Sequence, residues 1–136
     1  MSKLKLVKTS HAISQIGLHI IWCTKFRHKA LNNGVDITVK RVIGESCRTY
    51  GWQCHALEVM PDHVHLFIQI HHTDSPCNVA KTLKSLTALA VFTSHPKLKS
   101  QKFWGSGLWS DGTFYSSVGG VSQETVAKYI AEQKTK

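Results

Sequence analysis

Two histidines separated by one residue stand at the head of an apolar segment in the middle of the chain. The segment MPDHVHLFIQI covers residues 60–70, and His63 and His65 follow directly after the turn signal Pro61–Asp62. In a strand, residues i and i+2 project from the same face, so the two imidazoles would lie side by side. Such a pair can bind one divalent ion. Alternatively, these are ordinary strand histidines in a chain that contains nine.

Two imidazoles do not complete a metal site, so a further ligand and a reacting group must come from elsewhere in the chain. Tyr129 and Gln133 are four residues apart near the C-terminus, which places them on one face of a helix. A phenol can act as a nucleophile, and an amide oxygen can bind a metal ion. Alternatively, Tyr129 is an amphipathic core residue that packs beside Val126 and Ile130.

Other residues near the histidine pair allow other interpretations. Asp62 directly precedes His63, so its carboxylate either holds that imidazole in place or simply forms the turn. A zinc site could combine His63 and His65 with Cys77 or with the pair His71–His72, but the usual spacing of zinc ligands is missing. The eight acidic residues suggest no convincing carboxylate triad.

The hydrophobic pattern predicts the elements that position these residues. Strands are expected at 12–26, 52–60, 63–70 and 113–119, and helices from an Asp36 N-cap to Tyr50, from Ser75–Pro76 to His95, and over 122–136 with Ser122 as the cap. The first six of these seven elements match an α+β fold, a ferredoxin-like split β-α-β antiparallel sheet with helices on one face. An appended C-terminal helix carries Tyr129, and residues 1–136 form a single domain.

The charge balance points to a polyanionic partner. Seventeen Lys and Arg face eight Asp and Glu, a net charge of +9, which favours nucleic acid over a membrane surface. The densest basic cluster comprises Lys25, Arg27, His28 and Lys29, which either contact DNA or form a solvated loop. Trp104 and Trp109 are either base-stacking or core residues.

Nothing in the sequence favours export or a membrane. The four cysteines lack the spacing of a redox or zinc motif, the N-terminal segment is too polar for a secretory signal, and the longest apolar run is too short to span a bilayer. We therefore expect reduced, mostly buried thiols in a cytoplasmic protein, associated with the nucleoid if the host is a prokaryote.

The sequence resembles the single-tyrosine HUH transposases of the insertion-sequence 200/605 type. The resemblance covers nearly the whole chain, in the family's order and spacing, and is carried by GLHIIWCTKFRHKAL (17–31), ALEVMPDHVHLFIQI (56–70), LWSDGTFYSSVGGVS (108–122) and VAKYIAEQ (126–133). One departure is visible: the family usually has an aromatic residue at the position of Thr113, whereas here the tyrosine is Tyr115.

The resemblance implies a specific chemistry. By position, His63, His65 and Gln133 would bind Mg²⁺ or Mn²⁺, and Tyr129 would attack a phosphodiester to form a 5′-phosphotyrosine. The implied substrate is single-stranded DNA with subterminal hairpins. The implied assembly is a homodimer in which each tyrosine helix docks against the partner's histidine pair. Two alternatives remain: a domesticated relative that nicks and joins hairpin DNA, and a non-catalytic nucleic-acid-binding protein on the same fold.

Overall fold

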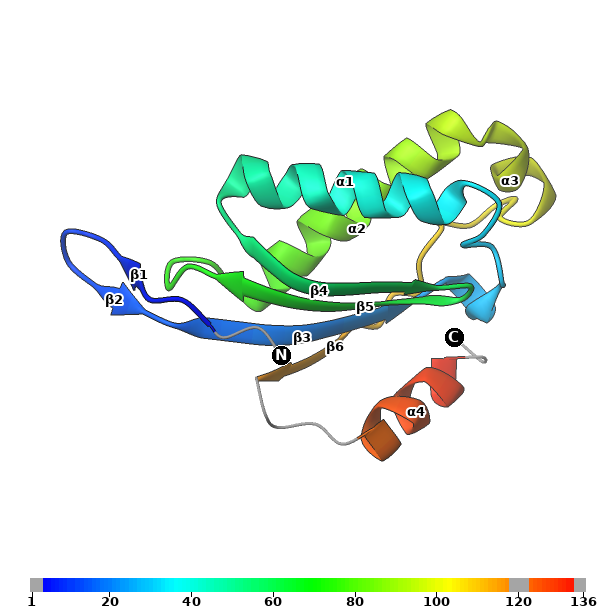
Figure 1. Cartoon of the computed structure of the whole chain (residues 1–136). Helices are drawn as coiled ribbons and strands as arrows, with labels where there is room; N and C mark the ends of the chain where they lie inside the picture. Colours follow the sequence, from blue (N-terminus) through cyan, green and yellow to red (C-terminus); the bar gives the residue numbers. More distant parts are fainter. Residues whose placement is uncertain (1–3, 118–122, 134–136) are drawn as a thin grey trace.

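The computed structural model describes residues 4–117 and 123–133 of the 136-residue chain (Figure 1). The described elements, in chain order, are β1 (Val7–Lys8), β2 (Ile13–Ser14), β3 (Ile16–Cys23), the 3₁₀ turn η1 (Lys25–Arg27), α1 (Val35–Tyr50), β4 (Gln53–Met60), β5 (His63–Ile70), α2 (Pro76–Ser94), α3 (Pro96–Gln101), β6 (Phe114–Ser117) and α4 (Gln123–Glu132).

Four strands form an antiparallel sheet in the order β4-β5-β3-β6. The order confirms the ferredoxin-like arrangement, because the first and third of these four strands along the chain lie side by side in the middle. Helices α1 and α2 cover one face of the sheet, and α4 lies against the other face (Figure 1). The predicted placement of helices on one face therefore holds for α1 and α2, while the appended helix occupies the second face.

Strand alternation separates the two faces of the sheet chemically. On β5, Val64, Leu66 and Ile68 are fully buried in the core that α1 and α2 complete, while His63 and His65 are half-buried on the opposite face. Burial of each such aliphatic side chain contributes roughly 1.5–3 kcal/mol, which fixes the register of the strand. The two histidines therefore project together toward the side of α4, as their spacing predicts.

The helix boundaries agree with the prediction in one case and correct it in another. Helix α2 has the predicted Ser75 cap, whose Oγ accepts a hydrogen bond from the Asn78 N–H at 3.0 Å. Helix α1 begins at Val35 after Gly34, whose φ of 97° lies in the left-handed region. The predicted N-cap Asp36 is therefore wrong, because Asp36 lies in the first turn, where its charge favours the helix N-terminus.

Other differences concern short elements. The predicted first strand is divided into β2 and β3, and β2 forms a small hairpin with β1. Pro96 ends α2 as predicted but also occupies the first turn of the additional helix α3, because proline is tolerated where no N–H bond is needed. The predicted cap Ser122 lies outside the described residues. Cys23 and Cys47 are buried as expected, whereas Cys54 and Cys77 are exposed.

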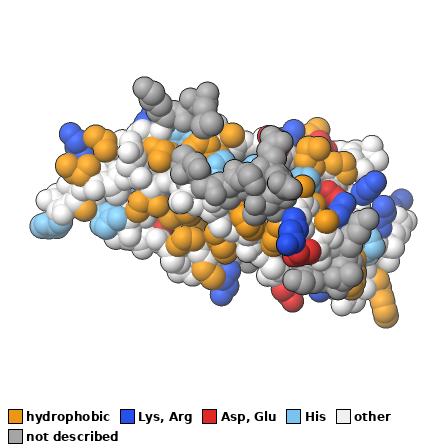
Figure 2. All heavy atoms as spheres, turned by 90° about the horizontal axis from the view of Figure 1, so that it is seen from below, with side chains coloured by type: hydrophobic (Ala, Val, Ile, Leu, Met, Phe, Trp, Pro, Cys, Tyr) orange, Lys and Arg blue, Asp and Glu red, His pale blue; other side chains and the backbone are white. Residues whose placement is uncertain are grey.

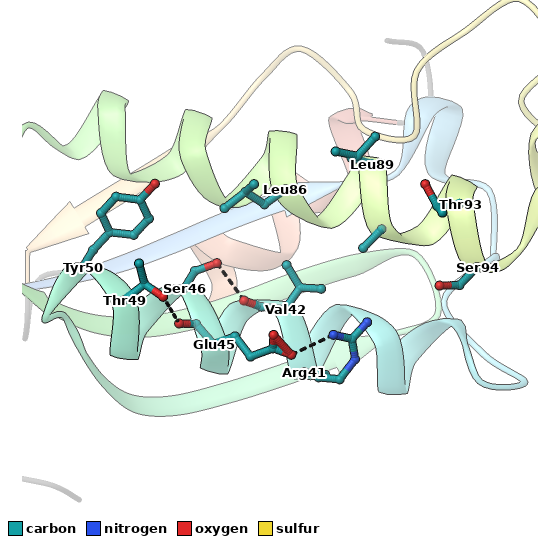
Figure 3. Close-up of a pocket in the computed structure, with 11 residues that line it drawn as sticks. Arg41, Val42, Glu45, Ser46, Thr49, Tyr50, Leu86, Leu89, Thr93 and Ser94 are labelled. Carbon is teal, nitrogen blue, oxygen red and sulfur yellow. Dashed lines mark hydrogen bonds and ion pairs between the residues drawn. The ribbon is translucent and has the colours of Figure 1, made fainter.

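The helical layer carries a groove of about 470 Å³ between α1 and α2 (Figure 3). Tyr50, Leu86 and Leu89 line it, and an ion pair of 2.7 Å joins Arg41 and Glu45 beside it. The sheet separates this layer from the histidine face, so the groove is no part of the candidate site. Within residues 4–117 and 123–133, no helix has the length and apolar character required to cross a bilayer.

Candidate active site

The histidine pair lies on the first residues of β5, which is a central strand of the sheet. His63 pairs with Cys23 of β3 and Met60 of β4, and His65 pairs with Ile21 and Glu58. Both neighbouring strands therefore hold the backbone of the pair. Figure 2 views this face from the side of α4 and shows histidine side chains among apolar ones. The sheet thus presents two imidazoles from a rigid element, as a metal or phosphate site requires.

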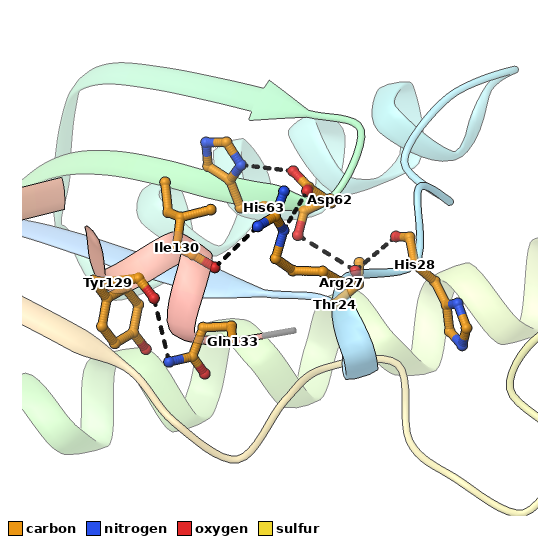
Figure 4. Close-up of polar contacts among 8 residues, drawn as sticks. All are labelled: Thr24, Arg27, His28, Asp62, His63, Tyr129, Ile130 and Gln133. Atoms are coloured by element: carbon orange, nitrogen blue, oxygen red, sulfur yellow. Dashed lines mark hydrogen bonds and ion pairs between the residues drawn. The ribbon is translucent and has the colours of Figure 1, made fainter. Parts of the chain in front are cut away.

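Asp62 holds the first histidine in place. Its Oδ1 lies 2.9 Å from His63 Nδ1, and its Oδ2 accepts a hydrogen bond of 2.8 Å from Arg27 Nε (Figure 4). Burial raises the pKa of the Asp62 carboxyl, but the bonds from His63 and Arg27 outweigh it and hold this pKa below its ordinary value. When Nδ1 of His63 donates to Asp62, Nε2 is free to bind a metal ion. The contact supports an orienting role for Asp62.

Arg27 has different neighbours from those expected of a DNA-contacting residue. Its side chain is mostly buried, and besides the ion pair with Asp62 its guanidinium donates to the Ile130 carbonyl of α4 at 3.4 Å. Phe26 and Arg27 have φ values of 54° and 55°, a conformation that costs non-glycine residues roughly 1–3 kcal/mol each. This turn directs Arg27 at Asp62, so of the predicted basic cluster Arg27 is committed to contacts within the protein.

The second histidine has a partner that sequence reasoning missed. His65 Nε2 lies 3.2 Å from His19 Nδ1, and the His19 ring stacks on Phe67 with 5.1 Å between centroids. Burial, followed by the nearby His19, lowers the pKa of His65. His19 on β3 lies diagonally opposite His65 on β5. This neighbour could have been identified only from the β3–β5 register, which the sequence does not reveal.

Tyr129 lies on α4 with its hydroxyl buried. Its ring contacts Phe114 of β6 with 5.2 Å between centroids, and its Oη finds no hydrogen-bond partner within the described part of the chain. Burial raises the pKa of Tyr129 to about 12, and the neighbouring Cys23 and Tyr115 add to this effect. A Cβ built on Gly112 would lie 3.3 Å from Tyr129 Oη, which is a tight contact. The absence of a side chain at Gly112 therefore leaves room for the phenol.

Gln133 lies directly after α4 and is only 2% exposed. Its Oε1 accepts a hydrogen bond of 3.2 Å from Ser110 Oγ, and its Nε2 donates to the Tyr129 carbonyl at 3.5 Å. Figure 4 shows Tyr129 and Gln133 together, with Ile130 and Arg27 between them and His63. The structure therefore brings together His63, Asp62 and Arg27 in one group and Tyr129 and Gln133 in another. The Arg27–Ile130 contact joins the two groups.

A lysine supports the loop beneath the tyrosine helix. Lys84 Nζ of α2 donates to the Ser110 carbonyl at 2.8 Å, the Gly112 carbonyl at 3.2 Å and Thr113 Oγ1 at 3.1 Å. Burial lowers the pKa of the Lys84 ammonium. Thr113, at which the family usually has an aromatic residue, thus accepts a hydrogen bond from Lys84. The sequence marks Lys84 only as a polar helix residue, so its role could not be predicted.

The donor types around His63 suit a divalent metal ion, although the described side chains do not converge on one. His63 carries a free Nε2 backed by a carboxylate, which is the arrangement that orients histidine ligands of metals. His65 offers a second imidazole on the same face, and Gln133 offers an amide oxygen. Among the described residues, no three His, Cys, Asp or Glu side chains are arranged to hold a metal ion.

The comparisons with known proteins identify the family to which this chain belongs. The sequence model described as "Transposase IS200 like" matches residues 12–133, so the chain belongs to the IS200-like transposase family. The ISDra2 transposase TnpA of Deinococcus radiodurans is 32% identical over 133 residues, which are 98% of this chain and 94% of that protein.

Two solved structures are similar to this chain. The crystal structure of a Deinococcus radiodurans R1 protein described as a transposase superposes with a TM-score of 0.82 at 32% identity, over 93% of this chain and 97% of that one. A REP-associated tyrosine transposase bound to a REP hairpin superposes with a TM-score of 0.56 at 14% identity, over 91% of this chain and 67% of that one. The second likeness supports the fold alone.

Proposed function

We propose that this chain cleaves and rejoins single-stranded DNA at hairpin-bearing ends of a mobile element, with Tyr129 as the nucleophile. Family membership and the net charge of +9 support a DNA substrate. The observation that carries the proposal is the position of α4, which packs on the same side of the sheet as His63 and His65 and contacts their group through the Arg27–Ile130 hydrogen bond.

Each residue of the site has a role in this reaction. Asp62 and Arg27 fix the His63 imidazole, and β5 presents His65 beside it. His63, His65 and Gln133 would hold Mg²⁺ or Mn²⁺, which supplies positive charge to a non-bridging oxygen of the scissile phosphate. Tyr129 lies near the C-terminal end of α4 and Gln133 directly follows this helix, so one movement of α4 would bring both residues to the histidine pair.

The covalent step conserves the energy of the phosphodiester. Tyr129 Oη attacks phosphorus, the bond to the 3′-oxygen breaks, and the DNA leaves a free 3′-hydroxyl and a 5′-phosphotyrosine. A 3′-hydroxyl of another end then attacks the phosphotyrosine and releases the phenol, so no nucleotide cofactor is needed. Because burial holds the Tyr129 proton in the described conformation, the phenol must leave its apolar surroundings before it attacks.

Strand transfer joins two DNA ends, so we propose that the active form is a homodimer with two such sites. Each α4 would dock against the histidine pair of the partner, which is the arrangement that the family resemblance implies. Mixing two inactive variants tests this arrangement. Tyr129→Phe and His63→Ala protomers should together restore cleavage if the tyrosine acts in trans, and they should stay inactive if it acts within its own chain.

The central experiment incubates the protein with a hairpin-bearing single-strand oligonucleotide and Mg²⁺ or Mn²⁺. We expect a covalent protein–DNA adduct that survives denaturation, and we expect its loss in Tyr129→Phe but not in Tyr50→Phe, an exposed tyrosine of α1. An adduct formed by Tyr129→Phe would refute the assignment of the nucleophile. Hairpin binding without any adduct would instead favour a non-catalytic nucleic-acid-binding protein.

The genomic setting separates the two catalytic alternatives. A transposase gene lies between two hairpin-bearing ends that the protein cleaves, whereas a domesticated relative lacks its own pair of ends. Either enzyme would act on DNA in the cytoplasm, at the nucleoid if the host is a prokaryote. Cleavage of both flanking ends by the purified protein would assign the mobile element.

A further inference from the structure

One tryptophan stands out because it is almost completely exposed. Trp104 is 85% exposed, whereas the other three tryptophans of the chain, Trp22, Trp52 and Trp109, are all buried. The structure thus resolves the two interpretations left open by the sequence, since Trp109 belongs to the core and Trp104 does not. A large indole held in water forgoes the stabilisation that burial would give it.

The exposed position of Trp104 is held by an anchored loop. Phe103 and Leu108, on either side, are fully buried. The Phe103 N–H donates to the Leu98 carbonyl at 3.3 Å, and the Ser106 N–H donates to the Phe103 carbonyl at 3.0 Å. Gly105, with φ of 76°, provides the turn directly after the indole. The ring is therefore presented by a fixed turn, as a stacking residue would be.

The basic loop that follows β3 packs against this turn. The His28 ring meets the Phe103 ring edge-on with 5.3 Å between centroids, and the Lys25 N–H donates to the Leu108 carbonyl at 2.9 Å. Phe26 is a second exposed aromatic residue in this loop, with Lys25 Nζ 5.3 Å from its ring centroid. Two basic segments that lie about 75 residues apart in the sequence thus form one surface.

A hollow continues this surface toward α3. The hollow has a volume of about 460 Å³ and lies between the 30–35 loop and α3. Apolar side chains make up much of its lining (Ala30, Val35, Pro96 and Leu98), and Asn32, Asn33 and Gln101 add amide groups while Lys97 and Lys102 add ammonium groups. Amides can hydrogen-bond to the edges of unpaired bases, while ammonium groups attract phosphates. These amide and ammonium groups are ones that a nucleic-acid strand can use.

The same loop leads directly to the histidine pair. Arg27 lies between Phe26 and His28, and its ion pair with Asp62 places the loop beside His63 at the start of β5. A strand bound along the loop would therefore approach the site at which the phosphodiester is cleaved. The basic surface and the candidate active site form a continuous path at one end of the sheet.

We propose that this surface binds the unpaired DNA strand that runs into the active site, an inference that rests on the proposed function. It comprises Lys25, Phe26, Lys29, Lys97, Lys102 and Trp104. Trp104 and Phe26 stack on unpaired bases, and the lysines hold the flanking phosphates. A paired stem hides its base faces, so the exposed indole and phenyl rings select the single-stranded segment over the hairpin stem.

The test compares binding to an unstructured oligothymidylate with binding to a blunt hairpin stem. Oligothymidylate should quench the fluorescence of Trp104, and Trp104→Ala should bind it roughly tenfold or more weakly, whereas Trp104→Phe should retain most of the affinity. Stem binding should stay unchanged in both variants. Equal weakening of stem binding, or no weakening of oligothymidylate binding, would overturn the proposal, as would a change from dimer to monomer in Trp104→Ala.

The lysines are tested through the salt dependence of binding. Lys97→Gln combined with Lys102→Gln should lower the slope of log K against log salt for oligothymidylate by about 0.7 per lost phosphate contact. Lys40→Gln combined with Arg48→Gln is the matched control, because it removes the same charge from exposed positions on α1. An equal change of slope in the control would show that net charge alone matters and would overturn the surface assignment.

The outcome is independent of the test of Tyr129. If wild-type protein forms the covalent adduct but Trp104→Ala binds oligothymidylate normally, the surface is wrong and the proposed function stands. If oligothymidylate binding depends on Trp104 but no adduct forms, the surface stands and the proposed function fails.

Discussion

At the scale of single residues, the site depends on how one imidazole is held. Asp62 accepts from both His63 and Arg27, and Arg27 also reaches the Ile130 carbonyl. The sequence allowed Arg27 either to contact DNA or to lie in a solvated loop. In the structure its mostly buried guanidinium forms an ion pair with the buried Asp62 carboxylate, so its main role is structural. In the proposed reaction, Asp62 and Arg27 would orient His63 as a metal ligand without touching the substrate.

Replacement of Arg27 by lysine tests this positioning role. Lysine keeps the charge but cannot donate from two nitrogens in a fixed fork to Asp62 and Ile130, so we expect cleavage to fall roughly 10- to 100-fold. Oligonucleotide affinity should remain close to that of the wild type. The measurement pairs single-turnover cleavage with binding anisotropy across a range of Mg²⁺ concentrations.

The control for this experiment is Arg41→Lys, which alters an exposed ion pair with Glu45 that contributes little. A parallel loss of DNA affinity in Arg27→Lys would show that Arg27 contacts DNA, as the sequence cluster suggests, and would contradict the positioning role.

At the scale of elements, α4 is held on the sheet by a loop that α2 supports. Lys84 of α2 donates hydrogen bonds to the 110–113 loop, and the same loop contacts Tyr129 and Gln133. A Cβ at Gly112 would lie 3.3 Å from both Tyr129 Oη and Gln133 Oε1, which is closer than side chains normally approach. The docking of the tyrosine helix is therefore sensitive to the size of residue 112.

Gly112→Ala should loosen α4 selectively. The added methyl group must displace the two α4 side chains, at a cost of about 1–3 kcal/mol. We expect faster hydrogen exchange of the α4 amides with little change in β3 and β5, measured by mass spectrometry. Gly107→Ala is the matched control, because a Cβ there meets nothing within 4 Å. Unchanged α4 protection in Gly112→Ala would show that the helix tolerates the contact.

At the scale of the whole molecule, the fold gathers part of the net charge of +9 in one region. The tertiary structure joins the 24–31 loop to the 97–104 segment, so lysines from two parts of the chain lie near one another. On the face of the sheet opposite the histidine pair, the helical layer carries a groove whose lining is mainly apolar, beside which Arg41 and Glu45 neutralise each other in an ion pair. DNA is therefore expected to approach the histidine end of the sheet.

Binding of hairpin-bearing DNA should weaken steeply with salt because phosphate contacts release counterions. Affinity measured by fluorescence anisotropy between roughly 50 and 200 mM salt should fall by at least tenfold if several lysines contact phosphates. Titration with a neutral osmolyte of matched osmolality serves as the control. A flat salt profile would contradict a basic binding surface.

The sequence by itself determined the strand that carries the two histidines, the common face of this pair, and a C-terminal helix that contains Tyr129. These follow from local physics: alternation places His63 and His65 on one face, and a spacing of four places Tyr129 and Gln133 on one face. The family resemblance, carried by segments along the whole chain, agrees with the match over residues 12–133.

Only the tertiary structure decided which residues surround these groups. His19 reaches His65 through a strand register, Lys84 reaches residues 110–113 from another helix, and Arg27 turns into the protein through two left-handed residues. The difference between Trp104 and Trp109 also depends on long-range packing. Such contacts join positions far apart in the chain, and their formation depends on how the layers pack together, which no local pattern specifies.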